Sequence, residues 1–125
     1  MMKVLYVEDE PAQRELVNQL LSLAGFEVHL ANNGLDGVAQ AERWRPNVIL
    51  MDLRMPGLNG FEAIERIRGI PSIAATPVIV LSAWTGTRLD QRATDLGVLR
   101  CVTKPFELED LLEAIEAVSH SASDS

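Results

Sequence analysis

Short apolar segments recur along the chain and predict buried β-strands. They are four or five residues long, are rich in β-branched residues and show no regular alternation of polar side chains. Such segments are typical of strands covered on both faces, as in parallel sheets packed between helices. Four segments show this pattern, at 4–7, 48–51, 78–81 and 99–103, and the segment 27–31 is predicted as a further strand.

Between these segments, apolar residues recur with the period of an α-helix. The stretch from Pro11 to Ala24 has Pro in its first turn and Gly25 after its end, both typical of helix boundaries. Strands and helices therefore alternate five times. Right-handed crossovers then give an α/β fold with three layers, a doubly wound parallel (βα)5 sheet with helices on both faces. The other predicted helices cover 34–44, 60–69, 86–96 and 107–118.

The chain is predicted to form one domain. Its 125 residues can build a single core that buries roughly two-thirds of the unfolded surface. The predicted domain covers residues 1–118. The remaining segment, 119–125, is rich in serine and is predicted as a flexible polar tail or the stub of a linker.

Charge and composition narrow the class of partner. The 18 acidic residues exceed the 11 Lys and Arg, giving a formal net charge of −7. This balance argues against direct nucleic-acid binding and favours a basic protein surface as partner. The single cysteine, Cys101, excludes an intramolecular disulfide, and neither a signal peptide nor a membrane-length apolar stretch of ~20 residues is found. We therefore expect a cytoplasmic protein without a membrane segment.

Polar residues stand directly after four of the predicted strands. In an open α/β sheet, ligands bind beyond the carboxyl ends of the strands. Residues at these ends should therefore converge although the chain separates them widely. They are Glu8 and Asp9 after the first segment, Asp52 after 48–51, Ser82 after 78–81 and Lys104 after 99–103.

This set of residues suits the transfer of a phosphoryl group to a carboxylate. Such a transfer needs an ionised nucleophile, for which Asp52 is placed, and groups that neutralise and position the phosphoryl oxygens. Clustered carboxylates favour a hard dication, and Mg²⁺ takes oxygen ligands from carboxylates, water and phosphate. We expect Asp9 to bind Mg²⁺ directly and Glu8 to act through water. Lys104 would pair with one phosphoryl oxygen, and the Ser82 hydroxyl would donate a hydrogen bond to another.

Each of these residues also has an ordinary structural interpretation. Asp9 and Glu10 could cap the helix that follows them. Asp52 and Ser82 could be turn or cap residues, and Lys104 a solvated charge. Their joint placement at four strand ends of one sheet favours the chemical interpretation.

In order and spacing, these residues resemble the receiver domain of two-component response regulators. The resemblance covers about residues 3–118. It implies a flavodoxin-like sheet of order 2-1-3-4-5, an aspartate phosphorylated by a histidine kinase or histidine phosphotransfer protein, and a requirement for Mg²⁺. The motifs that carry it are Val4-Leu5-Tyr6-Val7-Glu8-Asp9-Glu10, Asp52 with Met55-Pro56-Gly57, Gly60 before a helix, Ser82-Ala83 and Lys104-Pro105-Phe106.

The resemblance also implies roles for residues around the site. The backbone carbonyl of Arg54 would be a further metal ligand, and the Lys104–Pro105 peptide bond would be cis. The side chains of Arg54 and Trp84 would flank the path of the hydrolytic water, so that their bulk slows autodephosphorylation. Cys101 stands where many receivers carry Tyr or Phe, a ring that moves with the switch; its ordinary structural interpretation is a small buried side chain. Movement of the loop 82–86, with Trp84, would then carry the signal.

The sequence therefore predicts a phosphorylation-activated switch that signals to an unknown downstream protein or output domain. It would catalyse only its own phosphorylation and autodephosphorylation, and so would not be an enzyme in the usual sense. A phosphatase of the haloacid-dehalogenase type also uses an Asp nucleophile with Mg²⁺, but Arg54 stands where that family needs a second Asp. A receiver-like module that binds a partner without phosphorylation stays open. So does the choice between a stand-alone shuttle and part of a larger regulator.

Overall fold

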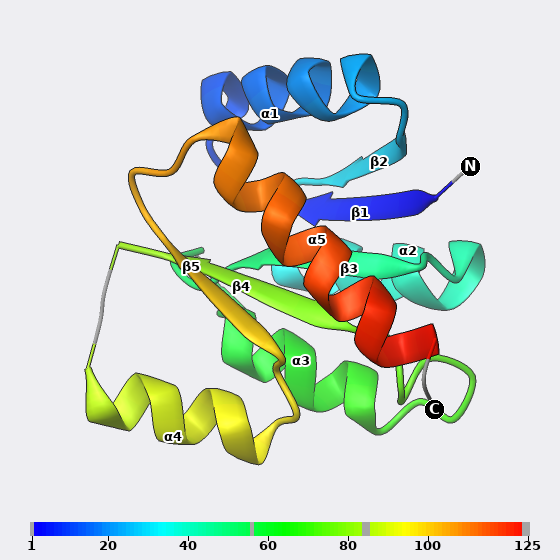
Figure 1. Cartoon of the computed structure of the whole chain (residues 1–125). Coiled ribbons are helices and arrows are strands. Elements are labelled where there is room, and N and C mark those ends of the chain that lie inside the picture. Colours follow the sequence, from blue (N-terminus) through cyan, green and yellow to red (C-terminus); the bar gives the residue numbers. More distant parts are fainter. Residues whose placement is uncertain (1, 56, 84–85, 124–125) are drawn as a thin grey trace.

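The computed structural model describes residues 2–55, 57–83 and 86–123 (Figure 1). Strands and helices alternate along this part of the chain, as the hydrophobic pattern predicts. The strands are β1 (Lys3–Val7), β2 (Glu27–Ala31), β3 (Val48–Asp52), β4 (Val78–Ser82) and β5 (Arg100–Thr103). The helices are α1 (Pro11–Leu23), α2 (Gly34–Trp44), α3 (Gly60–Arg68), α4 (Thr87–Asp95) and α5 (Leu108–Ser123).

The five strands form one parallel sheet in the order β2-β1-β3-β4-β5. Helices α1 and α5 cover one face, and α2, α3 and α4 lie on the other (Figure 1). This arrangement confirms the predicted three-layer fold and its strand order. Every described helix is too short or too polar to cross a lipid bilayer.

The inner strands β1, β3 and β4 are buried along their whole length except for Lys3, as their apolar sequences predict. Their side chains alternate between two apolar clusters, one on each face of the sheet. In β1, for example, Leu5 and Val7 join the cluster under α2 and α3, whereas Val4 and Tyr6 join the cluster under α1 and α5. The sheet is thus fixed from both faces, and so are the ends of its inner strands.

The segment 99–103 differs from the expectation of a strand covered on both faces. It forms β5 at the edge of the sheet, where Arg100, Cys101 and Thr103 are exposed and Leu99 is 51% exposed. An edge strand pairs with a neighbour on one side only, so more of its surface stays open to solvent. The prediction of a buried Cys101 is therefore wrong.

The helices lie close to their predicted ranges, with one extension. Asn33 caps α2 by accepting a hydrogen bond from the N–H of Asp36, and Asn59 forms a capping box with Glu62 at the start of α3. Helix α5 continues to Ser123, five residues beyond the expected end at residue 118. The division into a domain at 1–118 and a tail or linker stub at 119–125 stays a prediction.

Candidate functional site

The carboxyl ends of the strands bring three carboxylates together. Glu8 follows β1, Asp9 is the next residue, and Asp52 ends β3. Each offers an oxygen that lies within 4.8 Å of an oxygen of the other two. Strands β1 and β3 are hydrogen-bonded neighbours in the middle of the sheet, so the pairing of the sheet itself sets this short spacing.

Asp52 is held by a donor at each of its two carboxylate oxygens. Its side chain is buried, with only 4% of the residue exposed. The backbone N–H of Arg54 donates to Oδ1 at 3.2 Å, and the ammonium of Lys104 donates to Oδ2 at 3.1 Å. These two donors fix the orientation of the carboxylate at the end of β3.

Glu8 is the most deeply buried of the three carboxylates, with 1% of the residue exposed. Its Oε1 accepts from Lys104 at 3.5 Å, and its Oε2 has no hydrogen-bond partner in the part of the chain that the structure describes. Burial raises the pKa of Glu8 to about 8, with a further contribution from the neighbouring carboxylate of Asp52. The site therefore holds more acceptors than its own donors satisfy.

This excess of carboxylate oxygen fits a hard dication. Lys104 is the cation that forms ion pairs with these carboxylates among the described residues, and it reaches both Glu8 and Asp52. One ammonium faces three adjacent acidic groups, so ionisation of all three would leave uncompensated negative charge in a buried place. An ion such as Mg²⁺, which prefers oxygen ligands, would neutralise this charge and use the free oxygen of Glu8 directly or through water.

Ser82 and Lys104 lie at the carboxyl ends of two neighbouring strands, β4 and β5. Ser82 ends β4 opposite Thr103 of β5, and its carbonyl accepts from the N–H of Lys104 at 2.8 Å. Ser82 is buried, with 7% of the residue exposed. The Lys104–Pro105 peptide bond is cis, as the resemblance implies. Both residues therefore stand at the same end of the sheet as the carboxylates.

The structure distinguishes the roles of two adjacent acidic residues, Asp9 and Glu10, which the sequence could not. Glu10 is the N-cap of α1, where its side chain accepts from the N–H of Gln13 at 2.6 Å. Asp9, beside it in the chain, belongs instead to the carboxylate cluster. The capping interpretation thus applies to Glu10.

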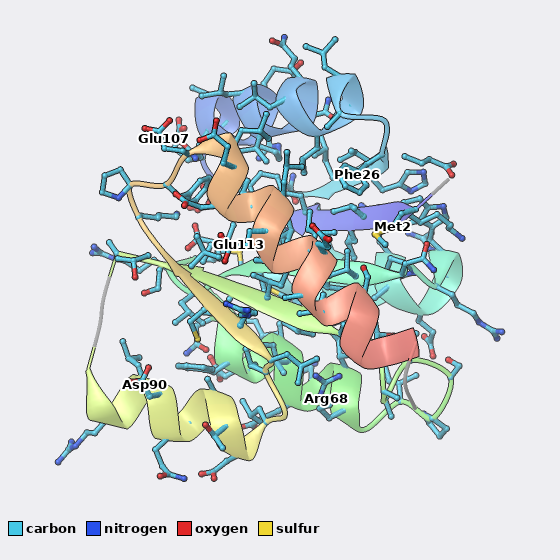
Figure 2. The ribbon with its side chains drawn as sticks, in the orientation of Figure 1. Met2, Phe26, Arg68, Asp90, Glu107 and Glu113 are labelled. Atoms are coloured by element: carbon cyan, nitrogen blue, oxygen red, sulfur yellow. The ribbon has the colours of Figure 1, made fainter. Side chains whose placement is uncertain are left out.

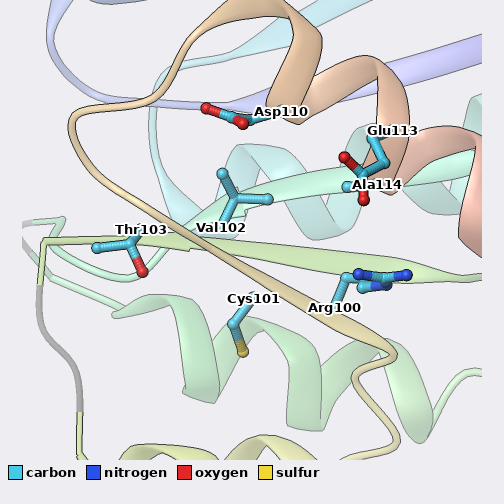
Figure 3. A pocket seen from close by; sticks show the side chains of 7 residues that line it. All are labelled: Arg100, Cys101, Val102, Thr103, Asp110, Glu113 and Ala114. Atoms are coloured by element: carbon cyan, nitrogen blue, oxygen red, sulfur yellow. The ribbon is translucent and has the colours of Figure 1, made fainter.

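The predicted switch residues lie in different surroundings. Arg54 is exposed, at the mouth of the site, and its backbone contacts Asp52 as described above. Trp84 lies outside the described residues. Cys101 borders a hollow of about 300 Å³ between β5 and α5, and its thiol points away from α5, on the opposite side of β5 from Val102 (Figure 3). Partial burial and the negative charge of Asp90 raise the pKa of this thiol.

Two further residues shape the site without having been singled out from the sequence for this purpose. Tyr6 is fully buried, and burial together with the charges of Glu8 and Asp52 raises the pKa of its hydroxyl. Its position two residues before Glu8 on one strand was the available signal. Arg14 donates to the carbonyl of Glu8 at 2.9 Å, and with Asp9 it borders a hollow of about 620 Å³. No pattern in the sequence marks this contact.

Gly60 permits the close approach of α3 to the end of β3. A Cβ atom at this position would lie 2.5 Å from the carbonyl oxygen of Asp52 and 2.9 Å from Cα of Leu53. The N–H of Gly60 donates to the carbonyl of Leu53 at 3.2 Å. The glycine noted in the sequence motif therefore serves packing directly behind Asp52.

Comparison with known proteins agrees with this geometry. The chain is 37% identical to protein PilH of Pseudomonas aeruginosa, over 94% of this chain and 98% of that protein. It is 33% identical to the DNA-binding dual master transcriptional regulator RpaA of Synechocystis, but it spans only 49% of that protein's length. The structure of chemotaxis protein CheY4 of Vibrio cholerae has a TM-score of 0.90 and 34% identity, covering 94% of this chain and 98% of the other.

A family model extends the agreement to almost the whole chain. The model described as the response regulator receiver domain matches residues 4–116, which include every strand end that forms the carboxylate cluster. The matched region thus contains the three clustered carboxylates of Glu8, Asp9 and Asp52. The chain belongs to the family of response regulator receiver domains.

Proposed function

We propose that the chain is a signalling switch that accepts a phosphoryl group on Asp52 from a histidine kinase or a histidine phosphotransfer protein. The proposal rests mainly on the surroundings of the Asp52 carboxylate. This carboxylate is buried among acidic neighbours, is held by Lys104 and the N–H of Arg54, and stands at the carboxyl end of a central strand. A structural turn residue needs none of these neighbours.

The chemical step follows from this placement. A carboxylate oxygen of Asp52 forms the bond to phosphorus. The bond between phosphorus and the donor's histidine nitrogen breaks, and its electron pair stays on the imidazole. Lys104, now 3.1 Å from Oδ2 of Asp52, would pair with a phosphoryl oxygen in the product. The Ser82 hydroxyl would donate to another phosphoryl oxygen, and this contact would differ between the two states of the switch.

The donor set supports Mg²⁺ as the required ion. Asp9 and Asp52 would bind it directly, Glu8 would act through water, and the backbone carbonyl of Arg54 would complete the protein ligands. When bound, Mg²⁺ supplies positive charge that neutralises the phosphoryl oxygens. The clustered carboxylates and the free oxygen of Glu8 support this assignment.

The proposal extends to partners and place. The downstream partner is a protein or an output domain, reached in the cytoplasm, and the acidic net charge favours a basic protein surface over nucleic acid. The transcriptional regulator RpaA shows that a relative of twice this length can bind DNA. For this chain we propose no DNA contact of its own. The exposed Arg54 at the mouth of the site supports a slow loss of the phosphoryl group by hydrolysis.

Phosphorylation by a small donor tests the proposal directly. Incubated with acetyl phosphate and Mg²⁺, the wild type should gain the mass of one phosphoryl group, and excess EDTA should prevent the gain. Asp52→Asn should gain none. Asp95→Asn, which alters an exposed carboxylate on α4, should behave as the wild type. Phosphorylation of Asp52→Asn at the wild-type rate would refute the assignment.

The same sample also tests the alternative of a module that acts without phosphorylation. Beryllofluoride mimics a phosphoryl group on an aspartate and needs no donor. If neither acetyl phosphate nor beryllofluoride with Mg²⁺ modifies or binds the wild type, the chain acts as a phosphorylation-independent binding module.

A further inference from the structure

Arg68, the last residue of α3, makes an unusual set of contacts for a cation. Its guanidinium donates to the backbone carbonyls of Leu96 at 2.8 Å, Thr76 at 2.7 Å, Ala74 at 3.1 Å and Gly97 at 3.4 Å. Within the described part of the chain these acceptors are all neutral carbonyls. Burial lowers the pKa of the guanidinium, because the surroundings replace water without supplying a carboxylate. Figure 2 labels Arg68 where α3 ends.

The four carbonyls come from two loops that are distant in sequence. Ala74 and Thr76 lie in the segment that leads from α3 into β4. Leu96 and Gly97 lie in the turn that leads from α4 into β5. A single side chain therefore joins the end of α3 to the start of β4, the end of α4 and the start of β5.

The contact completes the C-terminal cap of α4. Gly97 has a φ of +74°, a left-handed conformation that suits glycine, and the N–H of Val98 donates back to the carbonyl of Ala93 at 2.9 Å. This turn satisfies carbonyls inside the helix but leaves those of Leu96 and Gly97 pointing outward. The guanidinium of Arg68 binds both of these carbonyls.

The two ends of α4 differ in how they are held. At the N-terminal end, Gly86 is the N-cap and provides no side-chain hydrogen bond. Within the described residues, the first half of α4 contributes the partly buried Leu89 and the charge of Asp90, which acts on Cys101, whereas the other contacts of α4 lie nearer its C-terminal end. There, Ala93 is buried, and Arg92 pairs with Glu65 and lies over the ring of Phe61.

We propose that Arg68 is a positioning residue that fixes the C-terminal end of α4 and the start of β5 against α3. Among the described residues, the N-terminal end of α4, which follows Ser82 along the chain, is then the less constrained end. A displacement that begins near Ser82 becomes a swing of α4 about the turn at Gly97. The role of Arg68 as an anchor stands on the contacts above, and the link to phosphorylation rests on the proposed function.

Arginine suits this position for a geometric reason. Its planar guanidinium presents five N–H donors in fixed directions and can serve several carbonyls at once. A lysine would keep the positive charge but would place it at a single point on a flexible stem. Arg68→Lys therefore keeps the positive charge but removes the planar set of donors, so it tests which of the two is needed. Arg66→Lys, on the exposed side of the same helix, is a matched control.

Hydrogen–deuterium exchange measured by mass spectrometry tests the anchor without any ligand. In Arg68→Lys, amides of residues 92–99 should exchange roughly tenfold faster or more, since hydrogen bonds to a charged donor are lost. Amides of β1 and α1 should exchange as in the wild type. Equal exchange at 92–99 in Arg68→Lys and Arg66→Lys would overturn the proposal. So would a uniform acceleration over the whole chain, because that result indicates a general loss of stability.

A second arm adds beryllofluoride and Mg²⁺ to the same variants. In the wild type, the change in exchange should be large at residues 86–91 and small at 94–99. In Arg68→Lys it should extend to 94–99. A wild-type change as large at 94–99 as at 86–91 would refute the swing about the anchored end. If the mimic does not bind at all, the proposed function fails, while the ligand-free result still decides the role of Arg68.

Discussion

The ammonium of Lys104 lies 3.1 Å from Oδ2 of Asp52, although 52 residues separate the two along the chain. The same ammonium lies 3.5 Å from Oε1 of Glu8. In the absence of a bound ion, Lys104 therefore balances part of the negative charge of two buried carboxylates. If Asp52 accepts a phosphoryl group as proposed, the ammonium would pair with a phosphoryl oxygen instead. Lys104 would then have a different partner in each of the two states.

Replacement of Lys104 by alanine should lower the stability of the ion-free protein and weaken beryllofluoride binding, but leave Mg²⁺ binding in place. Without the ammonium, Oδ2 of Asp52 and Oε1 of Glu8 lose a hydrogen-bond donor in a buried site, so the ion-free protein should lose about 1–3 kcal/mol of stability in urea. Mg²⁺ should still bind, whereas the affinity for beryllofluoride should fall because its oxygen-like fluorines lose a cationic partner. Calorimetric titration of both ligands checks this, with Arg88→Ala, an exposed cation on α4, as the control. Unchanged binding of beryllofluoride would remove Lys104 from the switch.

Asp9→Asn should weaken Mg²⁺ binding by roughly tenfold or more, because a charged ligand in direct contact with a dication is replaced by a neutral one. The adjacent Glu10 offers a matched control, since its side chain caps α1 instead of joining the cluster. Glu10→Gln should therefore bind Mg²⁺ nearly as the wild type does. Similar losses in the two variants would mean that general negative charge, and not ligation by Asp9, attracts the ion.

The high pKa of Glu8 predicts a pH dependence of stability when divalent ions are removed by EDTA. Its pKa is raised from 4.5 to about 8 in the folded protein. Above about pH 5, the unfolded chain releases this proton while the folded chain retains it, so the free energy of unfolding should fall as pH rises from about 5 to about 8. The fall should amount to up to a few kcal/mol.

Denaturation in urea at several pH values measures this slope. Glu8→Gln should flatten it, because the amide does not titrate, and Glu42→Gln, an exposed control, should leave it unchanged. Excess Mg²⁺ should also flatten the slope, since the ion favours the ionised carboxylate. An equally steep fall in Glu8→Gln would assign the titration to another group.

The apolar pattern predicted the burial of the inner strands correctly, but it wrongly predicted that the edge strand β5 is buried. Segments 48–51 and 78–81 are buried as expected, whereas 99–103, which also contains Arg100 and Thr103, is exposed apart from the partly buried Val102. The burial of a strand depends on what pairs with it and covers it, which its own sequence does not contain. The strand order 2-1-3-4-5 implied by the resemblance already placed the fifth strand at an edge, and there the order was the better guide.

The site was predictable because its residues stand at strand ends, whose convergence follows from topology alone. The sequence did not distinguish Asp9 from Glu10, because both precede the same helix and the difference lies in where each side chain points. The contacts of Arg68 were equally hidden. Backbone carbonyls carry no sequence signature, so a side chain that binds four of them looks like any other arginine at the end of a helix.

Gly60→Ala should destabilise the protein by about 1–3 kcal/mol, the usual cost of extra atoms in a packed region. The added methyl group would meet the carbonyl oxygen of Asp52 at 2.5 Å, so α3 or the end of β3 would have to shift. Gly69→Ala is the matched control, because its methyl group would meet its nearest neighbour at an ordinary 3.5 Å and its φ is −86°. Gly69→Ala should be neutral or slightly stabilising. Equal stability of the two variants, measured by urea unfolding, would show that the packing behind Asp52 is not tight.

The exposed edge of the sheet has a consequence for how such a protein can diverge after gene duplication. Asp52 depends on β1 and β3, which are covered on both faces and tolerate few substitutions. Arg100 and Cys101 stand on the edge strand β5, where both are exposed. Two copies could therefore acquire different partners by changing this edge while keeping the same chemistry. Separate pathways in one cell could then use one reaction without exchanging their signals.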